Sequence, residues 1–167
     1  GYSAAINAGI DHVGRRDAVL VLNPDVRLEP GSVASAARRL TGRVGIVVPT
    51  LVDGRGRRQS SQRREPTVRR ALAEAFLGGH LASRLGTGEV VADGPAYDVE
   101  RDVDWATGAA LLIASACLDD VGPFDESFFL YSEETDFMLR ARDAGWSTRF
   151  LPDVRAVHIG GELTTSP

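Results

Sequence analysis

The chain contains no lysine, because all 19 of its basic residues are arginine. Mechanisms that need a lysine amine are therefore excluded, including Schiff-base formation and the phosphate-binding lysine of a Walker-type loop. Only one cysteine is present, Cys117, so no internal disulfide can form. It stands in an apolar run, which is typical of a core position, and its solitary state fits a reducing cytoplasm.

Long hydrophobic runs and an excess of positive charge are also missing. No apolar run approaches the ~20 residues that a membrane-spanning helix needs. The formal net charge of −4 argues against nucleic acid as the main partner. Apolar residues make up 43% of the chain, which is enough for a folded core. We therefore expect one cytoplasmic domain over residues 1–167.

Helical and strand patterns alternate along the chain. A strand at 18–22, a helix at about 32–40 and a strand at 44–49 form a βαβ pattern, which predicts an α/β fold with a right-handed crossover and a mostly parallel sheet flanked by helices. Residues 53–102 interrupt this pattern as a variable region, with a helix at 67–76 and a long loop over 78–102. The other predicted helices are 3–13 and 133–144, and the other strands are 103–113, 148–151 and 154–158.

The most informative local feature is the apolar run 19–22, which stops at Asn23-Pro24-Asp25. This pattern indicates a strand that is buried on both faces of a sheet and ended by Pro24. Asp25 then follows the carboxyl end of a central strand, where open α/β sheets bind their ligands. A carboxylate there suits a divalent cation on a phosphate, although an ordinary turn capped by Asp25 would give the same pattern.

Two further features can carry chemistry. Glu133 and Glu134 begin a predicted helix, and His158 closes the last predicted strand. Taken alone, the acidic pair also fits a solvated helix start, and the histidine also fits a structural residue.

Several motifs appear together in an order that resembles the family 2 inverting glycosyltransferases, and among them the rhamnosyltransferase-like subgroup. The resemblance covers the whole chain apart from about 53–102. The most specific motif is Phe-Asp-Glu-Ser-Phe-Phe-Leu-Tyr-Ser-Glu-Glu-Thr-Asp at 124–136. The others are Gly-Tyr-Ser-Ala-Ala-Ile-Asn-Ala-Gly-Ile at 1–10, Asn-Pro-Asp at 23–25, Trp-Ala-Thr-Gly-Ala at 105–109, Ala-Gly-Trp at 144–146 and His-Ile-Gly-Gly at 158–161.

This resemblance implies a GT-A fold, a Rossmann-like α/β domain that binds a nucleotide-diphosphate sugar. It implies that Asp25 and His158 hold Mg²⁺ or Mn²⁺ on the diphosphate. Asn23 takes the first position of the Asp-x-Asp-like motif and contacts the donor as a neutral oxygen ligand. Asn7 is implied to lie near the nucleotide.

The resemblance also implies which groups catalyse the reaction. Glu134 corresponds to the general base, with Glu133 orienting it or binding the acceptor. The family usually has aspartate at the base position, so glutamate moves the carboxylate outward by about one methylene. The loop at Trp105, Thr107 and Gly108 would meet the donor sugar and the acceptor, with Gly108 on the donor side. Trp105 would stack on a sugar ring, unless it simply packs in the core.

The implied function is transfer of a hexose or deoxyhexose, such as rhamnose, with inversion. The donor would be a nucleotide-diphosphate sugar and the acceptor a glycan or lipid-linked glycan, as in polysaccharide assembly at the inner face of the cell membrane. The family's first strand should precede Gly1, so we expect a chain truncated at both ends, with half of the nucleotide site outside it. Any peripheral membrane association is expected to come from those missing regions.

Two alternatives remain open at the level of the sequence. One is a degenerate nucleotide-sugar binding domain without catalysis, which the Asp-to-Glu change at 134 would allow. The other is a sugar nucleotidyltransferase, which would need a glycine-rich loop with a basic residue for a triphosphate.

Overall fold

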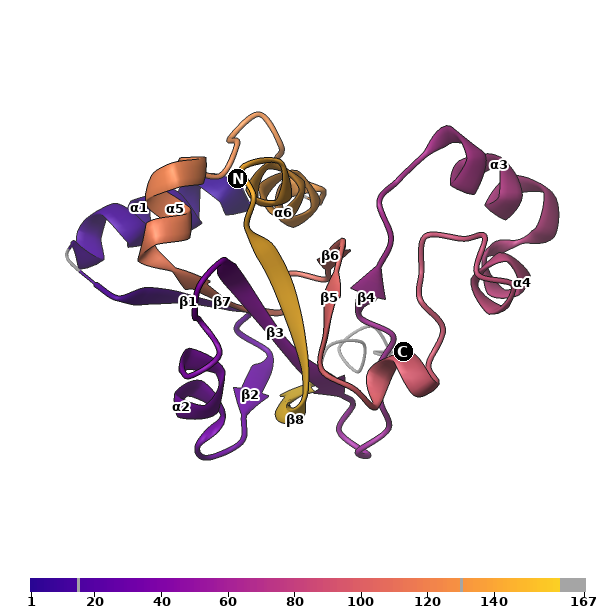
Figure 1. Ribbon diagram of the computed structural model, residues 1–167, viewed down its shortest axis with the longest axis horizontal. Helices are drawn as coiled ribbons and strands as arrows, with labels where there is room; N and C mark the ends of the chain where they lie inside the picture. The colour runs from indigo at the N-terminus through magenta and orange to yellow at the C-terminus, as the bar shows by residue number, and fades with distance from the viewer. Residues whose placement is uncertain (15, 130, 160–167) are drawn as a thin grey trace, which may run out of the picture.

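A mixed six-stranded sheet forms the centre of the computed structural model, which describes residues 1–14, 16–129 and 131–159 (Figure 1). The strand order is β1-β7-β3-β8-β2, and β5 also pairs with β8. The strands are β1 (Ala18–Leu22), β2 (Val26–Leu28), β3 (Val44–Val52), β5 (Arg101–Val103), β7 (Ala110–Ala114) and β8 (Ser147–His158). The α/β fold with flanking helices is thereby confirmed.

The strand directions correct the expectation of a mostly parallel sheet. Only β3 and β8 pair in parallel, whereas β1–β7, β3–β7, β2–β8 and β5–β8 are antiparallel. The strands β1 and β3 do point the same way, but β7 lies between them. The two strands of the predicted βαβ unit are therefore not neighbours in the sheet, because β7, from later in the chain, lies between them.

The strand β1 is also less buried than its sequence suggests. It lies at the end of the strand order, and Leu20 and Leu22 are 37% and 38% exposed. The prediction of a central strand buried on both faces was wrong, because an apolar run does not distinguish an edge strand from a central one.

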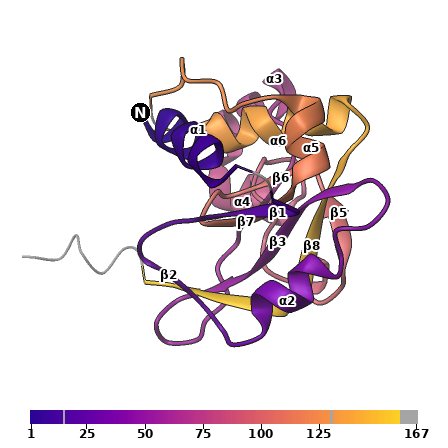
Figure 2. The ribbon, with the colours of Figure 1, turned by 90° about the vertical axis from the view of Figure 1, so that its left-hand side faces the viewer.

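Helices cover both faces of the sheet (Figure 2). Side chains on one face of β3, including Ile46 and Val48, share a core with Phe137 of α6, whereas Val47 packs on the other face with Ala36 of α2. The helices on the first face are α1 (Tyr2–Val13), α5 (Ser115–Val121) and α6 (Glu133–Asp143), and α2 spans Ser32–Ala37. Cys117 is fully buried in the first core, as its apolar run predicts.

The region 53–102 is more ordered than expected. The predicted helix is present as α3 (Val68–Leu77), but 78–102 is not a plain loop. It contains α4 (Gly79–Arg84), a 3₁₀ turn at Pro95–Tyr97 and the strand β5. Tyr97 is wholly buried against Phe150, and its hydroxyl accepts a hydrogen bond from the Gln62 amide. A second sheet of two strands, β4 (Gln62–Arg63) and β6 (Trp105–Ala106), joins this region to the loop that contains Thr107 and Gly108.

No helix in the described part of the chain is both long and apolar enough to span a bilayer.

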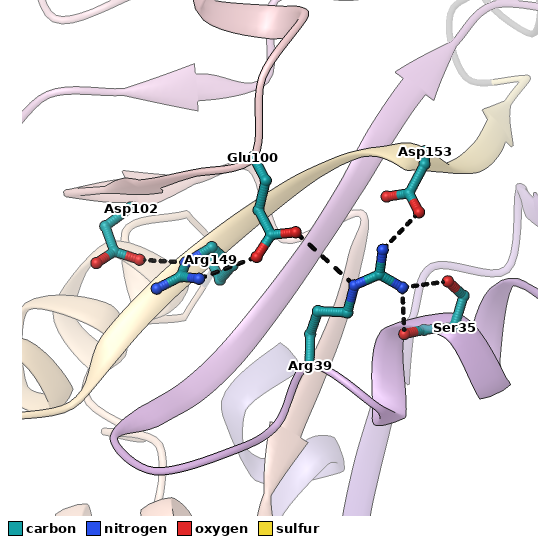
Figure 3. Close-up of polar contacts among 6 residues, drawn as sticks. All are labelled: Ser35, Arg39, Glu100, Asp102, Arg149 and Asp153. Carbon is teal, nitrogen blue, oxygen red and sulfur yellow. Dashed lines mark hydrogen bonds and ion pairs between the residues drawn. The ribbon is translucent and has the colours of Figure 1, made fainter.

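A network of ion pairs fastens the end of this region to the sheet (Figure 3). Glu100 bridges two arginines, at 2.9 Å from Arg149 and 3.7 Å from Arg39. Arg149 also pairs with Asp102, and Arg39 with Asp153 at 2.7 Å. Because Arg39 follows α2 while Arg149 lies on β8, one carboxylate ties three segments of the chain together.

We expect Glu100→Gln to lower the free energy of unfolding by about 1 kcal/mol at low salt, since it weakens both of the bridging pairs. The loss should shrink in high salt, because the pairs are partly exposed and therefore screened. Urea denaturation at two salt concentrations measures this. Glu29→Gln is the matched control, because its pair with Arg155 is longer, at 3.8 Å, and more exposed. Equal losses for both variants at low salt would contradict a bridging role for Glu100.

Candidate functional site

The predicted metal ligands Asp25 and His158 lie side by side. Asp25 follows β1 and precedes β2, and the pairing of β2 with the end of β8 brings His158 opposite Val26. The His158 Nε2 atom is 3.3 Å from Asp25 Oδ2, and the Ile159 amide donates to the Asp25 carbonyl oxygen. Residues that are 133 positions apart in the sequence thus form one corner of a site.

Gln59 determines how His158 presents its ring. The Gln59 side-chain amide donates to the His158 carbonyl oxygen at 3.4 Å, which leaves its Oε1 atom 3.2 Å from the His158 Nδ1 atom. Because Oε1 can only accept, this contact fits the neutral tautomer that has its proton on Nδ1 and its lone pair on Nε2. That lone pair faces a carboxylate oxygen, an arrangement that a cation between the two would stabilise.

The acidic pair at the start of α6 lies against the loop 105–109. Glu134 Oε1 is 3.4 Å from the Gly108 amide, which is directed at it as a long hydrogen-bond donor. A Cβ atom on Gly108 would approach the Glu134 Cβ atom to 3.3 Å. The glycine therefore allows the loop to come close to the carboxylate.

Both glutamates bury oxygen atoms that nothing satisfies. Among the described residues, neither Glu133 Oε2 nor Glu134 Oε2 has a hydrogen-bond partner, although both atoms are buried. Burial raises the pKa of Glu134, and the neighbouring Glu133 carboxylate raises this pKa further. Unpartnered buried carboxylate oxygens are costly in a folded protein and are typical of sites that receive a ligand or a proton.

The backbone before α6 is strained. Tyr131 and Ser132 both have positive φ angles, 69° and 70°, which side chains other than glycine rarely adopt. Ser132 is the N-cap residue by position, but its side chain makes no capping hydrogen bond. Two consecutive left-handed residues cost about 1–3 kcal/mol each and cluster at functional sites. Here they set the direction in which the acidic pair enters the helix.

Adjacent residues of one loop connect the acidic pair to the Asn-Pro-Asp turn. While Gly108 contacts Glu134, the next carbonyl oxygen, that of Ala109, accepts from the Asn23 amide at 3.0 Å. From the other side, the Tyr2 hydroxyl donates to Asn23 Oδ1 at 2.8 Å. Burial raises the pKa of Tyr2, and the charges of Glu133 and Glu134 raise it further, so Tyr2 lies within electrostatic reach of the pair.

The remaining predicted site residues have structural contacts of their own. Trp105 is 9% exposed, and its indole donates to the Arg64 carbonyl oxygen, which favours the packing alternative. The Thr107 amide donates to the Ser61 carbonyl oxygen. Asn7 exchanges hydrogen bonds with the backbone of Phe124 and also contacts Glu126, so its side chain holds the motif 124–136 against α1. Ligand contacts of these three residues stay predictions.

We expect Gly108→Ala to slow any reaction that uses the Glu134 carboxylate by about 10- to 100-fold, because the new methyl group would displace the Glu134 side chain by a few tenths of an ångström. The fold should be retained, since the φ angle at this glycine is not positive. Steady-state kinetics and thermal unfolding measure the two effects. Gly9→Ala, whose Cβ would enter open space, is the matched control. Equal rates for Gly108→Ala and the unmodified protein would show that the close approach has no role.

Sequence reasoning missed three residues near the site. Tyr2 stands within the motif at 1–10, but its position in that motif predicts no role. Gln59 lies in the variable region 53–102, which the family resemblance does not cover. The third is Arg63, whose guanidinium packs 5.9 Å from the Trp105 ring and adds positive charge near Glu134. Burial lowers the pKa of Arg63. No signal in the sequence pointed to Gln59 or Arg63, because only the folding of 53–102 onto the sheet brings them to the site.

No family model matches the chain. Comparison with curated proteins gives relatives that are named as glycosyltransferases. The chain is 32% identical, over 95% of its length, to N-acetylglucosaminyl-diphospho-decaprenol L-rhamnosyltransferase of Mycobacterium tuberculosis. It is 27% identical, again over 95% of its length, to the low-salt glycan biosynthesis hexosyltransferase Agl10 of Haloferax volcanii. It covers 55% and 48% of these two proteins, and thus spans about half the length of the curated relatives it matches.

A solved structure shows the same fold. The crystal structure of GalNAc-T7 with UDP, GalNAc and Mn²⁺ superposes with a TM-score of 0.67 at 13% identity, over 95% of this chain and 30% of that one. The chain therefore has the GT-A glycosyltransferase fold and is homologous, over nearly its whole length, to rhamnosyltransferase-like glycosyltransferases, as its motifs predict.

Proposed function

We propose that this domain transfers a hexose or deoxyhexose, with inversion, from a nucleotide-diphosphate sugar to a lipid-linked glycan acceptor. The observation that carries the proposal is the Glu134 carboxylate. It is partly buried, it has a raised pKa and one buried oxygen atom without a hydrogen-bond partner among the described residues, and it is linked through Gly108 and Ala109 to the Asn-Pro-Asp turn.

The donor set at Asp25 and His158 fits Mg²⁺ or Mn²⁺. Within the described residues, no cluster of three or more His, Cys, Asp or Glu side chains is arranged to hold a metal ion. A site with two protein ligands suits an ion that keeps several waters and takes its other ligands from substrate phosphates. When bound, such an ion would act as a Lewis acid on the diphosphate. Gln59 would keep the His158 Nε2 lone pair available to it.

The proposed reaction assigns the proton to Glu134. The ionised carboxylate accepts the proton of the acceptor hydroxyl while that oxygen forms a bond to the anomeric carbon. The bond from the anomeric carbon to the diphosphate oxygen breaks on the opposite face, so the configuration inverts and the nucleoside diphosphate leaves with the electron pair. Burial of Glu134 suits this role, since a raised pKa makes a carboxylate a stronger base.

The acceptor class is proposed from the curated relative. The name of the mycobacterial enzyme describes transfer of L-rhamnose to an N-acetylglucosaminyl-diphospho-decaprenol. By homology, we infer a diphosphate-linked polyprenol sugar as the acceptor and rhamnose as the first donor sugar to test. The structure of GalNAc-T7, which has the same fold, contains UDP and Mn²⁺, and this supports a nucleotide-diphosphate donor and a divalent cation. Action on such a lipid would place the protein in the cytoplasm, at the inner face of the membrane.

A donor screen tests this function. The protein, as produced from its gene, would be incubated with Mn²⁺, a polyprenyl diphosphate N-acetylglucosamine and single nucleotide-diphosphate sugars. Release of nucleoside diphosphate that requires both acceptor and Mn²⁺, with a product of inverted anomeric configuration by NMR, is expected. Donor binding without turnover for every sugar would instead favour a binding domain without catalysis.

A further inference from the structure

Helix α3 presents its apolar side to solvent. Val68, Leu72 and Phe76 recur at every fourth position, and they are 77%, 51% and 84% exposed. No residue of this helix is buried. In Figure 1, α3 and α4 stand apart from the helices that cover the sheet. A surface helix of a soluble domain normally turns such a stripe toward the core.

The polar side of α3 is the side that holds it to the protein. Glu74 accepts a hydrogen bond from the Glu89 amide at 2.7 Å, and Arg70 donates to the Glu65 carbonyl oxygen at 3.0 Å. These contacts, four residues apart, fix the orientation of the helix. The outward apolar stripe is therefore a consequence of specific hydrogen bonds and is not an effect of a loosely attached helix.

The neighbouring helix α4 adds to the exposed apolar surface. It packs against α3, and Leu81 and Leu85 at its outer side are 46% and 60% exposed. Ala82, between them in sequence, is fully buried and anchors α4. Exposed apolar residues that gather on adjacent elements are characteristic of an interaction surface.

Positive charge is concentrated in the same region. Residues 55–85 contain eight arginines and two acidic residues, a formal charge of +6, whereas the rest of the chain carries −10. Acidic residues outside the segment neutralise two of these arginines, because Arg57 pairs with Asp53 and Arg58 pairs with Asp93 and Asp98. Arg69 and Arg84, on α3 and at the end of α4, are exposed. Within the part of the chain that the structure describes, neither of them forms an ion pair. An acidic protein thus keeps one basic segment, next to its exposed apolar helices.

We propose that α3 and α4 form a docking surface for an anionic lipid bilayer. Val68, Leu72 and Phe76 would insert below the headgroups, while Arg69 and Arg84 would contact lipid phosphates. A short helix with leucine and phenylalanine on one side and arginine beside them is the arrangement that lies in a membrane interface. This surface belongs to the described chain, in contrast to the expectation that membrane association comes from regions outside it.

The docking surface extends the proposed function. Its purpose depends on that function, because the proposed acceptor is a lipid-linked glycan in the membrane. The strand β4 lies just before α3 in the chain, and it pairs with β6, which forms the first two residues of the loop 105–109. Binding of α3 to a bilayer would therefore bring the acidic pair of α6 near the surface where a lipid-linked acceptor is embedded.

Vesicle flotation tests the docking surface without donor or acceptor, so its outcome is separate from that of the transfer assay. We expect the protein to float with vesicles of phosphatidylglycerol and phosphatidylcholine, less at high salt, and not with phosphatidylcholine alone. Leu72→Ser combined with Phe76→Ser should weaken binding by roughly tenfold or more. Arg69→Gln and Arg84→Gln should each weaken it by about fivefold.

Matched controls have the same chemistry elsewhere on the surface. Val13→Ser on α1 and Arg38→Gln after α2 change exposed residues of the same types and should leave vesicle binding unchanged. Thermal unfolding should be the same for all variants, since each altered side chain is exposed. Absence of vesicle binding, or equal binding by the α3 variants and the controls, would overturn the proposal. So would self-association in sedimentation that the α3 variants abolish, because the surface would then bind a second copy of the chain.

Discussion

Replacing Glu134 with glutamine is expected to reduce the rate of sugar transfer by about 10²–10⁴-fold, the usual contribution of a positioned general base. The amide has nearly the same shape and can still accept from the Gly108 amide, but it cannot take the proton of the acceptor hydroxyl. Donor affinity should change little, because the diphosphate would be bound at Asp25 and His158. The measurement is turnover together with donor binding by calorimetry.

The pH dependence has a definite sign. Burial raises the pKa of Glu134 above the ordinary glutamate value of 4.5. Because the ionised form is the base, kcat/KM should rise with pH through a midpoint above 4.5, and this acid limb should be absent in Glu134→Gln.

The same shift predicts an effect on stability. A carboxyl group with a raised pKa in the folded state favours folding in its protonated form, and that contribution is lost as the pH rises through the folded-state pKa. Glu134→Gln should therefore be more stable than the unmodified protein at neutral pH, and the difference should vanish below pH 4.5. Thermal unfolding across this pH range measures it.

Glu29→Gln is the control for both effects, since Glu29 is an exposed glutamate outside the site. It should leave the rate, the acid limb and the unfolding temperature unchanged. If Glu134→Gln retained full turnover, Glu134 would not be the base. If it were destabilised at neutral pH, the ionised Glu134 carboxylate would stabilise the fold, and its pKa would not be raised.

Replacing Asp25 with alanine should remove most of the activity by a different route. Asp25 is the proposed ligand of the divalent cation, and Lewis-acid stabilisation of a leaving diphosphate contributes several kcal/mol, which corresponds to a loss of about 100-fold or more. Donor affinity should fall with it and should no longer depend on Mn²⁺. His158→Ala and Gln59→Leu should have smaller effects of about 10- to 100-fold, because one removes a ligand that water can replace and the other removes the partner of its ring.

Asp11→Asn, an exposed carboxylate on α1, is the matched control for Asp25→Ala. A manganese titration followed by donor binding distinguishes the two. Unchanged Mn²⁺-dependent donor affinity in Asp25→Ala would contradict the metal assignment. In that case the 3.3 Å contact between Asp25 and His158 would be an ordinary ion pair.

The sequence predicts those features of the fold that depend on neighbouring residues, and it does not predict those that depend on contacts between distant segments. The bounds of β1, α3 and α6 follow closely from local signals, such as Pro24 after β1, the capping side chain of Thr67 and the acidic first turn at Glu133. The predicted end of the strand 44–49 was wrong, because β3 continues through Pro49 to Val52 by pairing with β8. The insertion of β7 between β1 and β3 could not be read from the sequence, because strand order depends on contacts between distant segments. An apolar run looks the same in an edge strand and in a central one.

The candidate site divides in the same way. Asp25, Glu134 and His158 stand in recognisable motifs, and the structure brings Asp25 and His158 together while the loop 105–109 links Glu134 to the Asn-Pro-Asp turn. The roles of Gln59 and Arg63 depend on how 53–102 folds back over the sheet, which is decided by burial of Tyr97 and the pairing of β4 with β6. Those are long-range packing events without a local sequence signal.

The most direct test of the central claim measures nucleoside diphosphate release and Mn²⁺-dependent donor binding side by side in Glu134→Gln and Asp25→Ala. A base at Glu134 and a metal ligand at Asp25 predict that the first variant keeps donor binding but loses release, whereas the second loses both. Two variants that behave alike, or a Glu134→Gln variant that still releases nucleoside diphosphate at the full rate, would contradict the division of labour proposed for this site.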